Sequence, residues 1–215
     1  MAIDDVGLWC QIGRADYAGR PALFLDRDGV IVVDTRYLAR SEDLRMIEGA
    51  AAAIARCNTM GIPVVVVTNQ SGIARGYYDW DDFHAVQASL CHALAAAGAQ
   101  LDAVLACAYH AEGLRPMRVA DHPWRKPNPG MILTAGSRMS LDLSRSWIVG
   151  DRSHDLAAGM AAGLAGGTLL ASDDAERQQA RSLASAQFVV EIATNLADAV
   201  GGLIERRLFA KEVHS

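Results

Sequence analysis

Uninterrupted apolar segments alternate along this chain with longer segments that have helical character. The apolar segments lack polar alternation, which is typical of strands covered on both faces, and they span residues 22–26, 62–70, 101–110, 144–151, 166–171 and 187–191. Helices are expected between them, at residues 48–60, 79–97, 131–141 and 154–165, followed by a polar helix and a final helix to about Leu208. This order predicts an α/β fold, a three-layer doubly wound parallel sheet with helices on both faces.

The alternation indicates a single domain over residues 21–209. Residues 1–20, which include Trp9 and Tyr17, are expected to form an arm packed on this domain, and residues 210–215 a short tail.

The intervals between strands leave no room for a separate cap domain. About 40 residues separate Asp28 from Thr68, and about 56 separate Gln70 from Lys126. Both intervals are already occupied by predicted elements, whereas a cap usually needs about 50 residues of its own. We therefore expect an open site whose specificity comes from short loops, at residues 36–46, 71–80 and 111–124.

Composition narrows the possible functions. The chain has 215 residues, of which 51% are hydrophobic, and a formal net charge of −5 with scattered Lys and Arg. This pattern indicates a sizeable core and no nucleic-acid partner, but it allows a small anionic ligand. The four cysteines form no CxxC pair, the N-terminus begins acidic, and no segment has the roughly 18 apolar residues of a membrane span. We expect a cytoplasmic protein without disulfides, signal peptide or membrane partner, either a monomer or a weak homodimer.

Polar residues gather where the predicted strands end. Asp26 and Asp28 follow the first strand, Thr68 and Asn69 end the second, and Asp151 ends the fourth. Ligands of doubly wound sheets bind at these carboxyl ends. Two carboxylates one residue apart raise each other's pKa or need a cation between them. The alternative is that both are solvated turn residues.

A cluster of carboxylates at one sheet edge provides hard oxygen ligands of the kind that Mg²⁺ prefers. Asp155 lies one helical turn after Asp151 and on the same side, so it either joins this cluster or is simply an acid at a helix N-terminus. Thr68 and Asn69 either donate to a phosphoryl oxygen or cap the next helix. Lys126, just before a proline, either neutralises a phosphoryl group or is solvated.

Four motifs occur in a specific order: DRDGVI, TNQSGIARG, RKPNPGM and GDRSHD. Together they resemble the haloacid dehalogenase (HAD) superfamily of phosphatases over roughly residues 22–200. Within it they are most similar to the subgroup of D-glycero-D-manno-heptose 1,7-bisphosphate 7-phosphatases and histidinol-phosphate phosphatases.

The resemblance implies a division of roles. Asp26 would be the nucleophile that forms an aspartyl-phosphate, and Asp28 would protonate the leaving group and then activate water. Mg²⁺ would be held by the Asp26 carboxylate, the main-chain carbonyl of Asp28, and Asp151. The remaining roles are to bind the phosphoryl group, by Thr68, Asn69 and Lys126, and to face the rest of the substrate, by Ser71, Arg75 and Arg125.

The expected activity is therefore Mg²⁺-dependent hydrolysis of a small phosphorylated metabolite, a sugar phosphate such as the heptose bisphosphate. The alternatives are a histidinol-phosphate or other small-metabolite phosphatase, a receiver-like module that senses phosphate, and a catalytically silent scaffold.

The sequence departs from the subgroup in a loop that often carries zinc as C-x-H followed by C-x-C. Cys107 is in place, but Tyr109 stands at the next ligand position and His122-Pro123-Trp124 replaces the second pair. Zinc is therefore not expected, and the loop would pack instead through Pro116, Pro123 and Trp124. A rearranged site remains open, formed by Cys107, His110, Asp121 and His122.

Overall fold

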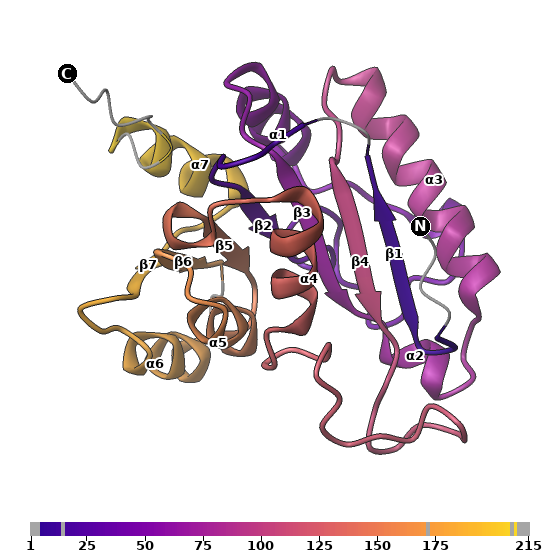
Figure 1. The fold of residues 1–215 in the computed structure, drawn as a ribbon. Coiled ribbons are helices and arrows are strands. Elements are labelled where there is room, and N and C mark those ends of the chain that lie inside the picture. The colour runs from indigo at the N-terminus through magenta and orange to yellow at the C-terminus, as the bar shows by residue number, and fades with distance from the viewer. Residues whose placement is uncertain (1–4, 14–15, 171–172, 207–208, 210–215) are drawn as a thin grey trace.

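The computed structural model describes residues 5–13, 16–170, 173–206 and 209. These residues form a three-layer α/β fold whose sheet has the strand order β1-β4-β3-β2-β5-β6-β7 (Figure 1). Every neighbouring pair is parallel except β1 and β4. The strands are β1 (Leu8–Ile12), β2 (Leu23–Leu25), β3 (Val64–Asn69), β4 (Ala103–Cys107), β5 (Trp147–Gly150), β6 (Gly166–Leu169) and β7 (Val189–Ile192). The predicted fold class is confirmed.

The helices are α1 (Ala50–Thr59), α2 (Ser71–Ala74), α3 (Trp80–Ala96), α4 (Gly130–Met139), α5 (Ser153–Ala161), α6 (Asp174–Ser182) and α7 (Leu196–Glu205). One face of the sheet packs against α1, α3 and α7, and the other packs against α4, α5 and α6. Short 3₁₀ turns lie at η1 (Ser41–Asp43) and η2 (Leu143–Arg145). None of the helices in the described part of the chain combines the length and hydropathy needed to span a bilayer.

The central strands are apolar on both faces because each face has its own helical layer. In β3, Val64 and Val66 contact one core cluster while Val65 and Val67 contact the other, and all four side chains are fully buried. Burial of one such side chain stabilises the fold by about 1.5–3 kcal/mol. The strand pattern read from the sequence thus has a direct cause in the packing.

The N-terminal arm contributes a strand that the sequence pattern does not predict. Residues 8–12 pair antiparallel with β4 and place Leu8 opposite Cys107. Trp9 packs against the α3 side chains Trp80, Phe83 and His84, with ring centroids 5.5–6.1 Å apart. The segment is short and only partly buried, so its alternation is weak, and it forms a strand because β4 offers it a free edge.

Within the described residues, no separate domain covers the carboxyl end of the sheet. Between β2 and β3 the chain forms η1 and α1, and between β3 and β4 it forms α2 and α3. Residues 108–129 form the long connection from β4 to α4, which extends past this end of the sheet in Figure 1. The final helix ends at Glu205 within the described residues, and the predicted tail lies outside them.

Candidate active site

A cavity of about 170 Å³ opens at the carboxyl ends of β2, β3 and β5. Its charged lining residues are Asp26, Arg27, Asp28, Asp34, Arg36, Arg125, Lys126, Asp151 and Arg152. Two of the three loops expected to provide specificity contribute to it, through residues 36–38 and through Ser71, Gly72 and Tyr78. The lining includes no residue of the third loop, 111–124, because Arg125 and Lys126 come next in the chain and occupy that side.

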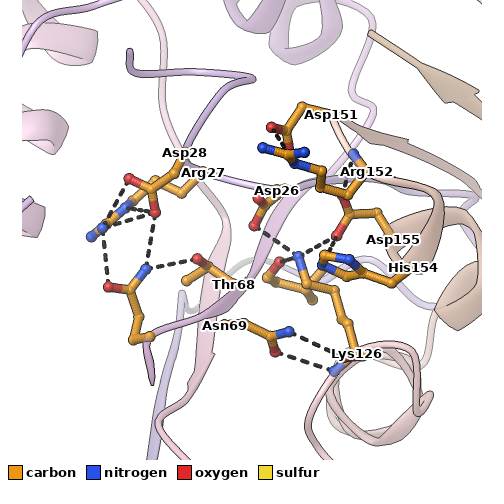
Figure 2. A network of polar contacts seen from close by, with 12 residues as sticks. Asp26, Arg27, Asp28, Thr68, Asn69, Lys126, Asp151, Arg152, His154 and Asp155 are labelled. Carbon is orange, nitrogen blue, oxygen red and sulfur yellow. Dashed lines mark hydrogen bonds and ion pairs between the residues drawn. The ribbon is translucent and has the colours of Figure 1, made fainter. Parts of the chain in front are cut away.

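Lys126 is the buried cation of the site. Its Nζ atom lies 2.7 Å from Asp26 Oδ1, 2.7 Å from Asp155 Oδ1 and 2.7 Å from the carbonyl oxygen of Val67 (Figure 2). The residue is only 3% exposed. Two carboxylates and a carbonyl thus hold the ammonium group in a single position beside Asp26.

Burial shifts the protonation of this cluster. It raises the pKa of Asp26 to about 7, where Lys126 opposes the shift and the carboxylates of Asp155 and Asp28 add to it. Burial and the charge of Asp155 raise the pKa of Asp151 to about 6. Burial also acts on Asp155 and Lys126, but their mutual attraction outweighs it, so the pKa of Asp155 is lowered and that of Lys126 is raised.

Three carboxylates converge tightly enough to share a cation. Asp26, Asp151 and Asp155 each offer an oxygen, and the three atoms lie within 4.8 Å of one another. This all-oxygen donor set, with more negative charge than Lys126 alone balances, fits Mg²⁺. Asp155, whose role the sequence left open, therefore belongs to the acidic cluster.

The Asp28 carboxylate does not join the cluster of Asp26, Asp151 and Asp155, and the family resemblance assigns only the main-chain carbonyl of Asp28 to the metal. The Asp28 side chain instead accepts from Arg27 Nε at 3.1 Å, from Arg27 Nη2 at 3.0 Å and from Gln70 Nε2 at 3.0 Å. Arg27 is itself fixed, because it is 1% exposed and its Cζ atom lies 5.2 Å from the ring centroid of Phe83. The Asp28 carboxylate lies beside the cavity on the side away from Lys126.

The turn after β2 depends on Gly29. Its φ angle is +78°, in the left-handed region that favours glycine, and an added Cβ would lie 2.5 Å from Asp151 Oδ2. The absence of a side chain there lets the Asp26–Asp28 segment approach the end of β5.

Thr68 and Asn69 have partners within the protein. Thr68 is buried and its Oγ1 accepts from Gln70 Nε2 at 2.8 Å. The Asn69 side chain pairs with the main chain of Lys126, donating to its carbonyl and accepting from its N–H, both at 3.1 Å. Asn69 thus joins the end of β3 to the segment that carries Lys126.

The residues expected to face the rest of the substrate divide into two groups. Ser71 and Arg125 line the cavity. Arg75 does not, because its guanidinium lies 2.9 Å from the Glu112 carboxylate and contacts His110 and Tyr37 instead.

The cavity also contains residues that the motifs did not single out. Arg36 lines it with a φ angle of +71°, and its N–H donates to Asp34 Oδ1 at 2.7 Å. His154 lines it with Nε2 3.5 Å from Asp155 Oδ1, and burial lowers the pKa of its imidazole. His154 stands inside the GDRSHD motif, which was a usable signal, whereas Arg36 is marked only by its place in the loop 36–46 that was expected to supply specificity.

The residues considered for a rearranged zinc site are used differently. Asp121 Oδ1 accepts from Asn128 and His110 contacts Arg75. Cys107 Sγ lies 4.0 Å from His122 Nδ1, but this nitrogen already accepts from the N–H of Trp124. Within the described residues, the metal-ligand cluster is the one formed by Asp26, Asp151 and Asp155. The absence of zinc from this loop stays a prediction.

Comparison with known proteins decides the family. Residues 123–199 match a family model described as HAD-hydrolase-like. A D-glycero-beta-D-manno-heptose-1,7-bisphosphate 7-phosphatase from Mesorhizobium japonicum is 51% identical over 170 residues, 78% of each chain. This chain belongs to the HAD phosphatases. The family predicted from the motifs and the assignment as an enzyme are confirmed.

Two solved HAD structures agree with the fold. One is a HAD-like protein from Mesorhizobium loti, with a TM-score of 0.86, 42% identity and 98% coverage of both chains. The other is a D,D-heptose 1,7-bisphosphate phosphatase from B. bronchiseptica in complex with magnesium and phosphate. It has a TM-score of 0.73 and 29% identity, and the match covers 86% of this chain and 99% of that one.

Proposed function

We propose that this HAD phosphatase hydrolyses a phosphorylated sugar, D-glycero-D-manno-heptose 1,7-bisphosphate, through an aspartyl-phosphate on Asp26. The observation that carries the proposal is the convergence of Asp26, Lys126, Asp151 and Asp155 at the open edge of the sheet. The names of the relatives and the chemistry of the cavity wall support the substrate.

In the first half-reaction, a carboxylate oxygen of Asp26 attacks phosphorus and the bond from phosphorus to the sugar oxygen breaks. The departing oxygen takes a proton from the Asp28 carboxyl group, which lies beside the cavity. Lys126 stabilises the negative charge on the transferring group from its fixed position beside Asp26.

In the second half-reaction, Asp28 takes a proton from a water molecule whose oxygen attacks phosphorus. The Asp26–phosphorus bond breaks, orthophosphate leaves and both carboxyl groups return to their starting states. Asp26, Asp151 and the main-chain carbonyl of Asp28 would hold Mg²⁺, and Asp155, whose carboxylate lies within 4.8 Å of the other two, would add negative charge beside them. A bound Mg²⁺ supplies positive charge that keeps Asp26 ionised and polarises the phosphoryl group.

The charge distribution around the cavity supports a substrate with a second anionic group. Besides Lys126, the guanidinium-bearing residues Arg36, Arg125 and Arg152 line the cavity, and the described residues form no separate cap domain over it. A sugar bisphosphate can place one phosphate at Asp26 and direct the other toward these arginines.

A substrate panel tests the proposal. We expect kcat/KM to be highest for one anomer of the heptose bisphosphate, lower for histidinol phosphate and p-nitrophenyl phosphate, and abolished by EDTA until Mg²⁺ is restored. Acid quenching during turnover should yield a phosphorylated peptide that contains Asp26. A preference for histidinol phosphate would replace the substrate, and phosphorylation without turnover would favour a receiver-like module.

A further inference from the structure

The N-terminal arm contacts Tyr109, which lies near the start of the 108–129 connection from β4 to α4. The Tyr109 hydroxyl donates to Asp5 Oδ1 at 2.8 Å, and the same oxygen accepts from the N–H of Gly7 at 2.9 Å. The N–H of Ala108 donates to the carbonyl of Gly7 at 2.8 Å. Gly7 lies directly on the Tyr109 ring, since an added Cβ would be 2.5 Å from Cε2. The residues just before β1 thus hold Tyr109 through a hydrogen bond to its hydroxyl, a main-chain hydrogen bond to the preceding Ala108, and packing on its ring.

Tyr109 in turn stacks on His122 across the loop. Their ring centroids are 4.1 Å apart and the planes differ by 15°. His122 Nδ1 accepts from the N–H of Trp124 at 3.2 Å, and the His122 carbonyl accepts from the N–H of Arg125 at 2.9 Å. The stacked rings therefore join the beginning of the 108–129 connection to the segment that enters the cavity.

The same connection ends at the cavity wall. Arg125 Nη1 donates to the carbonyl of Tyr109 at 3.1 Å, and Arg125 lines the cavity beside Lys126. Within the described residues its side chain makes this one hydrogen bond, whereas Lys126 is held separately by Asn69, Asp26 and Asp155. A disturbance at Tyr109 should therefore move Arg125 more than Lys126.

We propose that Asp5, Tyr109 and His122 are positioning residues that hold Arg125 at the cavity wall. This inference rests on the proposed function, in which Arg125 faces the part of the substrate beyond the transferred phosphate. Cys107, Tyr109, His122 and Trp124 occupy the positions where the family resemblance places zinc ligands. Stacked rings and the N-terminal arm supply here the cross-link that a metal would otherwise make.

Hydrogen exchange followed by mass spectrometry tests whether Asp5, Tyr109 and His122 hold the loop, without any need for catalysis. Tyr109→Ala should speed amide exchange in peptides from residues 109–125 by about tenfold, and Tyr109→Phe by a smaller factor because the stacking remains. Tyr17→Phe is the matched control, since Tyr17 also donates to an aspartate, Asp102, but does so at the opposite end of β4. Unchanged exchange of residues 109–125 in Tyr109→Ala would overturn the proposed positioning role. Equal effects of Tyr109→Phe and Tyr17→Phe on these peptides would do the same.

Kinetics with the heptose bisphosphate test the link to Arg125. We expect Tyr109→Ala to raise KM about tenfold while kcat falls by less than twofold, in line with the loss of a binding contact. Arg125→Ala should do the same, and the double variant should be no worse than Arg125→Ala alone. Additive effects, or a fall in kcat without a change in KM, would exclude action through Arg125. If the wild-type protein hydrolyses none of the esters but the variants show the expected differences in exchange, the result would count against the proposed function alone.

Discussion

The ammonium group of Lys126 lies 2.7 Å from the carboxylate of Asp26, although the two residues are 100 positions apart in the chain. The main chain of Lys126 is fixed to β3 by two hydrogen bonds with Asn69, and the Lys126 Nζ atom also donates to the carbonyl of Val67. This contact places a permanent positive charge next to the proposed nucleophile. It also keeps that nucleophile from being a buried and unpaired anion.

Replacing Asp26 by Asn should abolish turnover and leave the fold intact, because the substitution is nearly isosteric. The amide nitrogen and oxygen are far poorer nucleophiles toward phosphorus than a carboxylate. Steady-state hydrolysis and thermal unfolding measure the two effects separately. Retained activity in a correctly folded Asp26→Asn variant would remove Asp26 from its proposed role.

Replacing Lys126 should affect both catalysis and stability. Lys126→Ala is expected to lower kcat by about 10²-fold or more, the effect of losing one electrostatic stabiliser. Two carboxylates, Asp26 and Asp155, would stay buried without their cation, which costs about 3–5 kcal/mol in the metal-free protein. Lys126→Met, which keeps the length of the side chain, is the control that separates lost charge from lost packing. Unchanged kinetics in both variants would mean that Lys126 does not act on the phosphoryl group.

Replacing Asp28 should make the rate depend more strongly on the leaving group. A general acid matters most when the departing oxygen is a strong base, as in a sugar phosphate. We therefore expect Asp28→Asn to reduce kcat for a sugar phosphate by about 10²–10⁴-fold. For a dinitrophenyl phosphate the reduction in kcat should be much smaller, provided that breakdown of the aspartyl-phosphate is measured separately. Single-turnover kinetics on both esters give the comparison. An equal loss on both would show that Asp28 acts through structure and not as an acid.

In the metal-free protein, the contribution of Asp26 and Asp151 to stability should fall as the pH rises from about 4 to about 7. His110, His122 and His154, whose pKa values are lowered by burial, contribute in the opposite sense as the pH rises toward their ordinary value, so the prediction concerns the part of the pH slope that Asp151→Asn removes. Burial and nearby carboxylates raise the folded-state pKa of Asp26 to about 7 and that of Asp151 to about 6, from an ordinary value of 3.8. Between about pH 4 and the raised pKa values, the folded state keeps these protons whereas the unfolded chain has released them. Their contribution to stability is therefore complete below about pH 4 and is lost as the pH rises through the folded-state pKa values. Asp155, whose pKa is lowered, contributes in the opposite sense only below about 4.

Magnesium should reverse this pH dependence. A bound cation competes with the protons on Asp26 and Asp151, so the rise in Tm on adding Mg²⁺ should be larger at about pH 7.5 than at about pH 5. Thermal unfolding with EDTA and with MgCl₂ at the two pH values gives the result. Asp151→Asn should weaken both the pH slope and the Mg²⁺ shift. An equal Tm increase at the two pH values would argue against these carboxylates as the metal ligands.

The sequence by itself determined the strand–helix order, the open sheet edge and the family. These features follow from local patterns: apolar segments such as residues 64–67 require cover on both faces, and short motifs end the strands that carry Asp26 and Asp151. The positions of Asp26 and Asp151 at one edge followed from the topology of a parallel sheet, whereas the position of Lys126 beside them was implied by the resemblance to the family.

Only the tertiary structure decided which polar groups pair with one another. Arg27 and Gln70 draw the Asp28 carboxylate away from the acidic cluster, while Asp155 enters it and binds Lys126. Likewise, residues 8–12 become a strand because the edge of β4 is free to pair with them. The physical reason is common to all three cases. Each polar group has several possible partners of similar energy, and the fold selects among them by bringing distant segments into contact.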